Sequence, residues 1–324
     1  MSVAACLLLY GFAVAVLAPR LLCLVGHNGA APHFALAAWM SAIATTVLAW
    51  IAALVILVVD LLTHQISSVP ERFVNSCLWH LHDAWIGSYG APVQIGLWLL
   101  TGLVGLAMTV VAIRLCRTLL RARRVTLEHG RMARIAGRHH PGLDAVILEV
   151  DQPAAYCVAG KPHTVVVSRG VLAALDEQHL EAVLSHERAH LAGRHHLLLG
   201  LTRGLATVMP RINLFTLGAA EVAWLLEMVA DDAAARAHGR DTVLQALLAL
   251  SGITGESAPQ RGTAEVALTA RVARLAAPAT MPVRARARLS LTAAATTATL
   301  VPLAAVVAAA VGFVIGDPMF DNHN

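Results

Sequence analysis

The strongest constraint on the fold is a set of long apolar stretches that carry almost no charge. A membrane-spanning helix needs about 20 apolar residues, and four stretches are long enough: residues 3–25, 34–62, 91–113 and 289–315. Composition agrees, because 57% of the residues are hydrophobic and only 14% are charged, against about 25% charged in a soluble domain. The first stretch has no basic segment before it, which argues against a signal peptide. The sequence therefore predicts a multi-pass membrane protein in contact with the lipid bilayer.

A fifth apolar stretch, residues 197–226, contains Arg203, Pro210 and Arg211. Its leucines recur at helical spacing, which favours an amphipathic helix at the membrane interface or in the protein core. The alternative is a hairpin that enters the membrane.

Basic residues predict the orientation of the chain. The third stretch is followed at once by an arginine cluster, and the fourth is preceded by a second one: Arg114, Arg117, Arg121, Arg123 and Arg124, then Arg284, Arg286 and Arg288. The positive-inside rule places the interval between them in the cytoplasm. Both termini are then extracytoplasmic in a multi-pass protein of the cell membrane. Anionic headgroups and topology account for the arginines, so we expect no nucleic-acid partner.

This orientation predicts three parts: transmembrane helices in residues 1–116, a cytoplasmic domain in 117–288, and a fourth transmembrane helix with a short extracytoplasmic tail in 289–324. Within the cytoplasmic part, residues 145–150, 155–159 and 164–168 are short β-prone runs that predict a small sheet. A helix should begin after the N-cap Asp176 and run toward His196. The expected fold class is mainly α and integral to the membrane, with an α+β domain between the third and fourth spans.

The predicted helix contains an HExxH motif: His186, Glu187 and His190. Residues four apart share one face of a helix, so both imidazoles can bind one Zn²⁺ ion. Glu187 can then act as the base that accepts a proton from a water held at the metal. The motif predicts a zinc-dependent peptidase.

Catalytic zinc usually has three protein ligands and one open position. Glu227 is the strongest candidate for the third ligand, because Asp231 follows it by one helical turn and can accept the ring N–H of a ligating histidine. Glu221, His195 and His196 remain alternative ligands.

These motifs, together with the order of the apolar stretches, resemble the BlaR and MecR antirepressor metallopeptidases. The resemblance covers about residues 90–315, and its specific part is residues 156–196 together with 227–232. It implies a gluzincin-type domain in which His186, His190 and Glu227 bind zinc and Glu187 is the catalytic base. It also implies supporting roles for Asp231 and His195.

The chain departs from that family in one respect: no extracellular penicillin-binding sensor domain follows the last span. We therefore expect no β-lactam sensing. An edge strand containing Ala155, Tyr156 and Cys157 could align the backbone of a peptide substrate by β-augmentation.

Three functions remain open at this stage. The first is an endopeptidase that cleaves a cytoplasmic protein, with a transcriptional repressor in a signalling pathway as one candidate. The second is a quality-control protease for membrane proteins of the HtpX type, and the third is a non-catalytic scaffold. The scaffold is disfavoured because the spans contain few ionisable residues. The sequence leaves open whether the chain forms a homo-oligomer.

Overall fold

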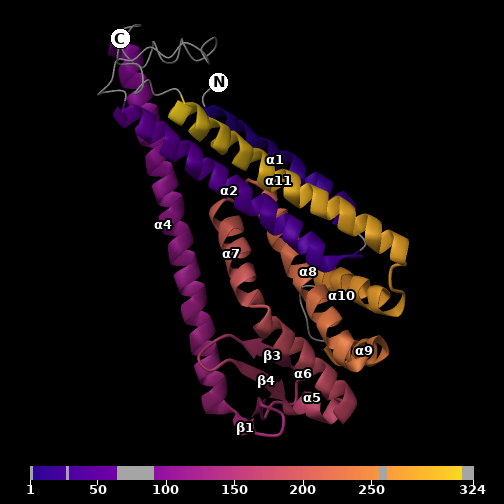
Figure 1. The fold of residues 1–324 in the computed structure, drawn as a ribbon. Coiled ribbons are helices and arrows are strands. Elements are labelled where there is room, and N and C mark those ends of the chain that lie inside the picture. Colours follow the sequence, from indigo (N-terminus) through magenta and orange to yellow (C-terminus); the bar gives the residue numbers. More distant parts are fainter. Residues whose placement is uncertain (1–2, 27–28, 64–90, 255–260, 316–324) are drawn as a thin grey trace.

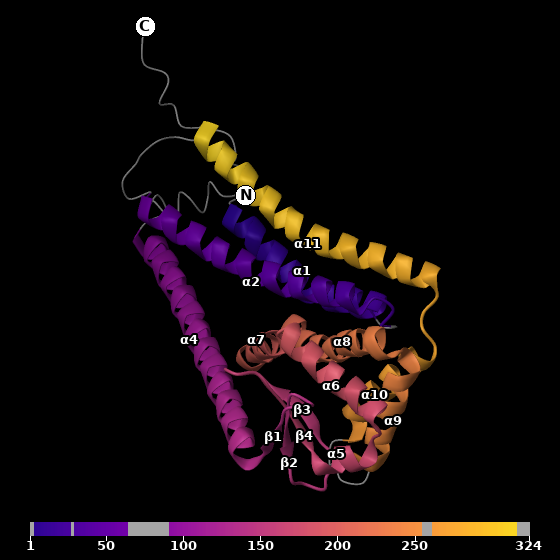
Figure 2. The same cartoon turned by 60° about the horizontal axis from the view of Figure 1, so that its bottom comes forward.

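The protein is mainly helical, with one small sheet (Figure 1). The computed structural model describes residues 3–26, 29–63, 91–254 and 261–315. Three long helices form one layer: α1 (Val3–Gly26), α2 (Pro32–Thr63) and α11 (Met281–Ile315). Figure 2 shows this layer above the sheet and the shorter helices. The apolar and polar parts of the chain are thus separated in space.

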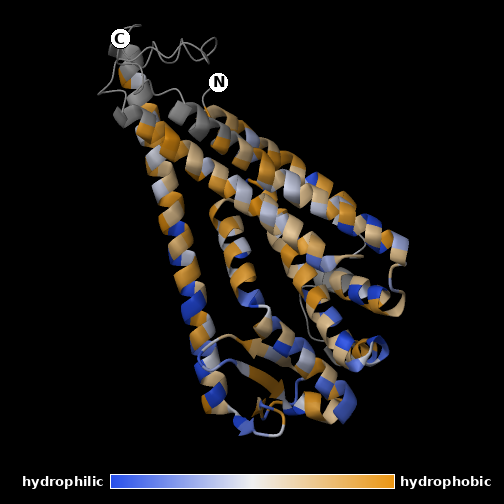
Figure 3. Cartoon of the chain, viewed as in Figure 1, coloured by the Kyte–Doolittle hydropathy of each residue, from blue (hydrophilic) through white to orange (hydrophobic). Residues whose placement is uncertain are grey.

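Within the described residues, four helical segments are long and apolar enough to cross a membrane: Val3–Gly26, Pro32–Val59, Leu99–Ala136 and Asn213–His238. The predicted fourth stretch lies in α11. Large apolar side chains are exposed on this layer; Leu9 of α1 is 60% exposed, Phe12 is 65% exposed and Leu300 of α11 is 58% exposed. Figure 3 shows that most residues of these helices are hydrophobic. Soluble monomeric proteins rarely expose so much apolar surface to water. These helices therefore indicate a membrane protein.

The sequence predicted one amphipathic helix over residues 197–226. In the structure this stretch forms parts of two helices. Helix α7 (His195–Val208) and helix α8 (Asn213–His238) pack against each other as a hairpin, because Pro210 in the connection has no backbone N–H to continue a helix. Phe215 and Leu225 of α8 are buried against Trp39 of α2 in the largest apolar core. The hairpin therefore belongs to the same packed unit as α1, α2 and α11.

Glycines permit this close packing at two points. A Cβ atom at Gly218 would lie 3.1 Å from Ile43 of α2, and one at Gly204 would lie 3.0 Å from Leu115 of α4 (Ala91–Ala136). Helix α4 continues without a break past residue 116, where the sequence predicted a domain boundary. Its C-terminal half reaches the sheet.

The sheet has four strands in the order β1-β2-β4-β3. The predicted runs form β2 (Ala145–Leu148), β3 (Ala155–Val158) and β4 (Thr164–Ser168), and the structure adds β1 (Arg138–His140). β2 and β4 are parallel, whereas β1 and β3 are antiparallel to their neighbours. β3 therefore forms one edge of the sheet.

Helices cover both faces of the central strand β4, all of whose residues are buried. Val166 packs on Ala133 of α4, while Val165 and Val167 face a core shared with Leu184. Leu184 belongs to α6 (Glu177–Ala192), which packs on α9 (Arg240–Thr254) and shares this core with α5 (Arg169–Ala174). Helix α10 (Arg261–Ala276) packs on α9. This arrangement holds α6 between the sheet and α8.

Candidate metal centre

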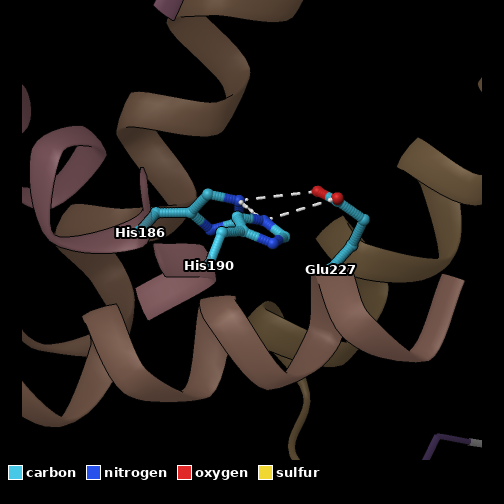
Figure 4. A group of neighbouring side chains, drawn as sticks. All are labelled: His186, His190 and Glu227. Carbon is cyan, nitrogen blue, oxygen red and sulfur yellow. Dashed lines mark hydrogen bonds and ion pairs between the residues drawn. The ribbon is translucent and has the colours of Figure 1, made fainter. Parts of the chain in front are cut away.

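Helix α6 begins where the sequence predicted. The side chain of Asp176 accepts a hydrogen bond from the backbone N–H of His179 at 2.8 Å, which caps the first turn. Leu180 and Leu184 anchor the helix in the core. His186 and His190 then lie one turn apart and point together toward α8 (Figure 4).

Three side chains from two helices converge at this point. Nε2 of His186 lies 3.5 Å from Oε2 of Glu227, and Nε2 of His190 lies 3.5 Å from Oε1 of the same carboxylate. The two Nε2 atoms are 3.1 Å apart. These ligating atoms all lie within 4.8 Å of one another, so one small cation can contact all three.

Asp231 orients the first imidazole. Its Oδ1 lies 3.1 Å from Nδ1 of His186, and the carboxylate is 1% exposed. A proton on Nδ1 leaves the lone pair of Nε2 free for a metal ion. Asp231 thus lies in the position that the sequence assigned to it.

His195 contacts the second imidazole, because α6 is shorter than predicted. The helix ends at Ala192, and Arg194 takes a left-handed conformation with a φ of 50°, so the chain turns before α7 begins. Nδ1 of His195 then lies 2.8 Å from Nδ1 of His190. A Cβ at position 193 would lie 2.4 Å from Nε2 of His195, so only glycine leaves room for this ring. His195 can therefore fix the tautomer of His190.

Arg271 of α10 also belongs to this group, although no sequence pattern predicted it. Its Nε and Nη2 donate hydrogen bonds to Asp231 at 2.8 and 2.7 Å, and its Nη1 lies 3.1 Å from Oε2 of Glu227. The guanidinium therefore fixes the carboxylate that orients His186 and also contacts the candidate ligand. No local pattern marks this residue among 24 lysines and arginines, because it is far from Asp231 in sequence.

Glu187 lies at the edge strand β3. Its carboxylate lies close enough to Cys157 for the two side chains to shift each other's pKa. Burial raises the pKa of Glu187, and burial together with Glu187 raises the pKa of the Cys157 thiol to about 12. The thiol therefore stays protonated at neutral pH and does not act as a nucleophile.

The other two residues proposed to contact substrate also lie on β3. Ala155 is half-buried, whereas the side chain of Tyr156 points away from the core and is 39% exposed. The strand faces α6, so its free edge lies beside Glu187.

The alternative ligands lie elsewhere. Glu221 interacts electrostatically with Cys23 of α1, and His196 lies next to His163, with ring centroids 6.4 Å apart. Within the described residues, neither joins the group of His186, His190 and Glu227.

The electrostatics of this group suit a divalent cation. Burial by itself lowers the pKa of His186, but hydrogen bonds to Asp231 and Glu227 raise it to about 9. The carboxylates thus favour positive charge at this position, whether a proton or a metal ion supplies it. Burial lowers the pKa of His190 to about 4, so this ring is neutral at pH 7, as a ligand must be.

The donor set therefore fits Zn²⁺. Two imidazole nitrogens and one carboxylate are ligands that zinc prefers, and three protein ligands leave a coordination position open for chemistry. The Glu227 side chain is 39% exposed, so that position is accessible from outside.

Comparison with known proteins identifies a family. Neither curated proteins nor solved structures gave a match to this chain. The family described as Peptidase family M48, whose members are zinc-dependent, matches residues 119–284, about half of the chain. The matched segment includes α6, α7, α8 and α10, which carry the candidate ligands and the residues that fix them. The chain therefore belongs to peptidase family M48 and is a metallopeptidase.

Proposed function

We propose that the protein is a membrane-embedded, zinc-dependent endopeptidase. The observation that carries this proposal is the convergence of His186, His190 and Glu227, with Glu187 beside them at the edge of a sheet. His186, His190 and Glu227 would hold the ion. Asp231 and His195 would fix the two imidazole tautomers, and Arg271 would fix Asp231.

Glu187 is the proposed general base. Zinc, when bound, supplies a Lewis acid that lowers the pKa of a water molecule to about 7. With the ion in place, the Glu187 carboxylate would accept a proton from the water that attacks the peptide carbonyl, and would return that proton to the amide nitrogen of the bond that breaks. The raised pKa of Glu187 suits both transfers, because it lies closer to neutral pH than that of an ordinary carboxylate.

β3 is the proposed site of substrate alignment. Among the described strands β3 pairs only with β4, so its other edge could accept an extended peptide, which would then lie across the HExxH helix. Tyr156 would contact the side chains of that peptide, since it is exposed beside this edge. Ala155 and Cys157 would contribute backbone contacts only.

The proposed substrate is a protein segment on the cytoplasmic side. The arginine clusters favour an active site in the cytoplasm and termini outside. A soluble repressor, as in the BlaR and MecR resemblance, is one candidate, while the family match supports a zinc metallopeptidase and not that type in particular.

A second candidate, quality control of membrane proteins, is favoured by the α7–α8 hairpin. The hairpin packs against the apolar helix layer, and α8 contributes both Glu227 and an apolar segment long enough to cross a membrane. A site so close to the apolar layer can receive peptide segments that emerge from the bilayer.

Substrate trapping tests both candidates. The Glu187→Gln variant should bind zinc and substrate but not cleave, so captured proteins can be identified by mass spectrometry. A DNA-binding repressor among them favours signalling, whereas a broad set of membrane proteins favours quality control. Retained hydrolysis by Glu187→Gln would contradict the proposed mechanism.

A further inference from the structure

A cavity separate from the metal centre lies where the layer of α1, α2 and α11 meets helices α8, α9 and α10. It measures about 460 Å³ and is lined by the start of α2, the end of α8, the first residue of α9, the end of α10 and the start of α11. Its charged residues are Arg236, Arg240, Arg274, Arg284, Arg288 and one acid, Asp232. The cavity is thus strongly basic.

Most of this charge is not neutralised. Nη2 of Arg274 lies 2.5 Å from Oδ2 of Asp232, and its Nε donates a hydrogen bond to the carbonyl of Gly29 at 2.8 Å. The sole acid of the lining is therefore already paired. Arg236, Arg240 and Arg284 have no ion pair with any described residue, and the guanidinium of Arg288 lies 5.7 Å from the ring centroid of Phe34.

Four arginines that line one cavity and form no ion pair with any described residue are suited to an anion. Guanidinium groups form paired hydrogen bonds to phosphate oxygens, and the cavity is large enough for a phosphate group with substituents. Arg240 and Arg284 are half-buried, so each gives up water that a bound anion would replace.

The position of the cavity identifies the source of the anion. Leu24 at the end of α1 is 79% exposed and Leu289 of α11 is 75% exposed, so the arginines stand where an exposed apolar surface begins. Figure 3 shows the change from hydrophobic to hydrophilic residues along the first turns of α11. Phospholipid headgroups lie at this level of a membrane protein, and basic pockets between such helices bind them.

We propose that this cavity binds a phosphate-bearing anion, supplied by the headgroup of an anionic phospholipid whose acyl chains lie along the exposed apolar faces of α1 and α11. This site is independent of the metal ligands and of peptide hydrolysis.

Lipid retention by the purified full-length protein tests the proposal. The protein is delipidated in neutral detergent, and binding of phosphatidylglycerol and of phosphatidylcholine with the same acyl chains is measured by native mass spectrometry. We expect a preference of about tenfold for phosphatidylglycerol, which Arg240→Gln/Arg284→Gln removes. Arg286→Gln is the matched control, because Arg286 lies on the same helix as Arg284, is exposed and does not line the cavity.

Competition distinguishes the two sources of phosphate. If millimolar inorganic phosphate or glycerol phosphate does not displace the lipid, the lipid headgroup is the ligand. Displacement would keep the anion site but assign it to a soluble phosphate compound. Equal affinity of the wild type for both lipids, or an unchanged preference in the double variant, would overturn the proposal. Arg240→Lys/Arg284→Lys keeps the charge and should retain most of the preference, which shows that any loss is not a folding defect.

Discussion

Two acid–arginine pairs that link the same two helices lie side by side but have different surroundings. Asp231 and Asp232 are neighbours on α8, and each pairs with an arginine of α10, Arg271 and Arg274 respectively. Asp231 is 1% exposed and also binds His186, whereas Asp232 is 20% exposed and lies in the basic cavity. Neighbouring residues of a helix point about 100° apart. One pair therefore supports the metal centre while the next lines the basic cavity.

The largest difference between the two regions should appear in zinc content when a metal ligand is removed. We expect Glu227→Ala to reduce zinc from about one ion per chain to nearly none and to abolish hydrolysis, because a three-ligand site tolerates no loss. Asp232→Ala should keep its zinc. Metal analysis of the purified proteins measures both, and full zinc retention in Glu227→Ala would assign the third ligand to another residue.

Removal of the proposed base Glu187 should leave zinc binding unchanged but reduce peptide hydrolysis. Glu187→Gln cannot accept the proton of the attacking water, so we expect peptide hydrolysis to fall by about 10²- to 10⁴-fold with unchanged zinc content. Glu181→Gln is the control on the same helix, since Glu181 pairs with Arg188 away from the ligands. Similar losses in both variants would mean that α6 has been disturbed as a whole.

Substitutions of the two aspartates should differ by one to two orders of magnitude in their effect on zinc affinity or activity. Asp231→Asn keeps the shape but weakens the hydrogen bond that fixes Nδ1 of His186, and we expect about a 10- to 100-fold loss in zinc affinity or activity. Asp232→Asn should stay within about twofold in these assays, because its partner is Arg274. Zinc titration with a competing chelator compares them. Equal effects would show that the pairs act as one network.

The two arginines should differ in their effect on stability. Arg271→Gln leaves the buried Asp231 carboxylate without its countercharge, which should cost about 3 kcal/mol of unfolding free energy. Arg274→Gln leaves a carboxylate that is 20% exposed and can regain water, so it should cost less, about 2 kcal/mol or below. Thermal unfolding in detergent measures the order. Arg271→Lys should rescue only in part, because lysine cannot form the two parallel hydrogen bonds to Asp231.

The smallest effect on activity should come from cysteine substitutions that locate the membrane. Thr207→Cys and Thr216→Cys lie near the tip of the α7–α8 hairpin, and we expect activity within about twofold of wild type. Protection of both cysteines from aqueous labelling would place the hairpin in the bilayer, whereas strong labelling would place it at the interface.

A reporter fused after Gly130 should be cytoplasmic, and an outside signal would reverse the side on which both acid–arginine pairs lie.

Much of the local structure could be predicted from the sequence. Thr164–Ser168 is apolar and β-branched, so it forms β4 as expected, and Asp176 caps α6 because its short side chain reaches the free N–H groups of the first turn. Residues four apart lie on the same face of a helix, so the HExxH motif alone predicted that His186 and His190 lie together. The predicted C-terminal end of α6 was wrong, because the left-handed turn at Arg194 has no distinct sequence pattern.

The sequence by itself determined that the chain is apolar enough for a membrane and that α6 offers two imidazoles and a carboxylate to one ion. Only the tertiary structure decided that α8 lies close enough to bring Glu227 to that point, that α7 and α8 form a hairpin, and that Arg271 joins the site. The physical reason is that helical periodicity fixes neighbours within one turn of a helix. Contacts between residues far apart in sequence depend on how the helices pack, which only the assembled core specifies.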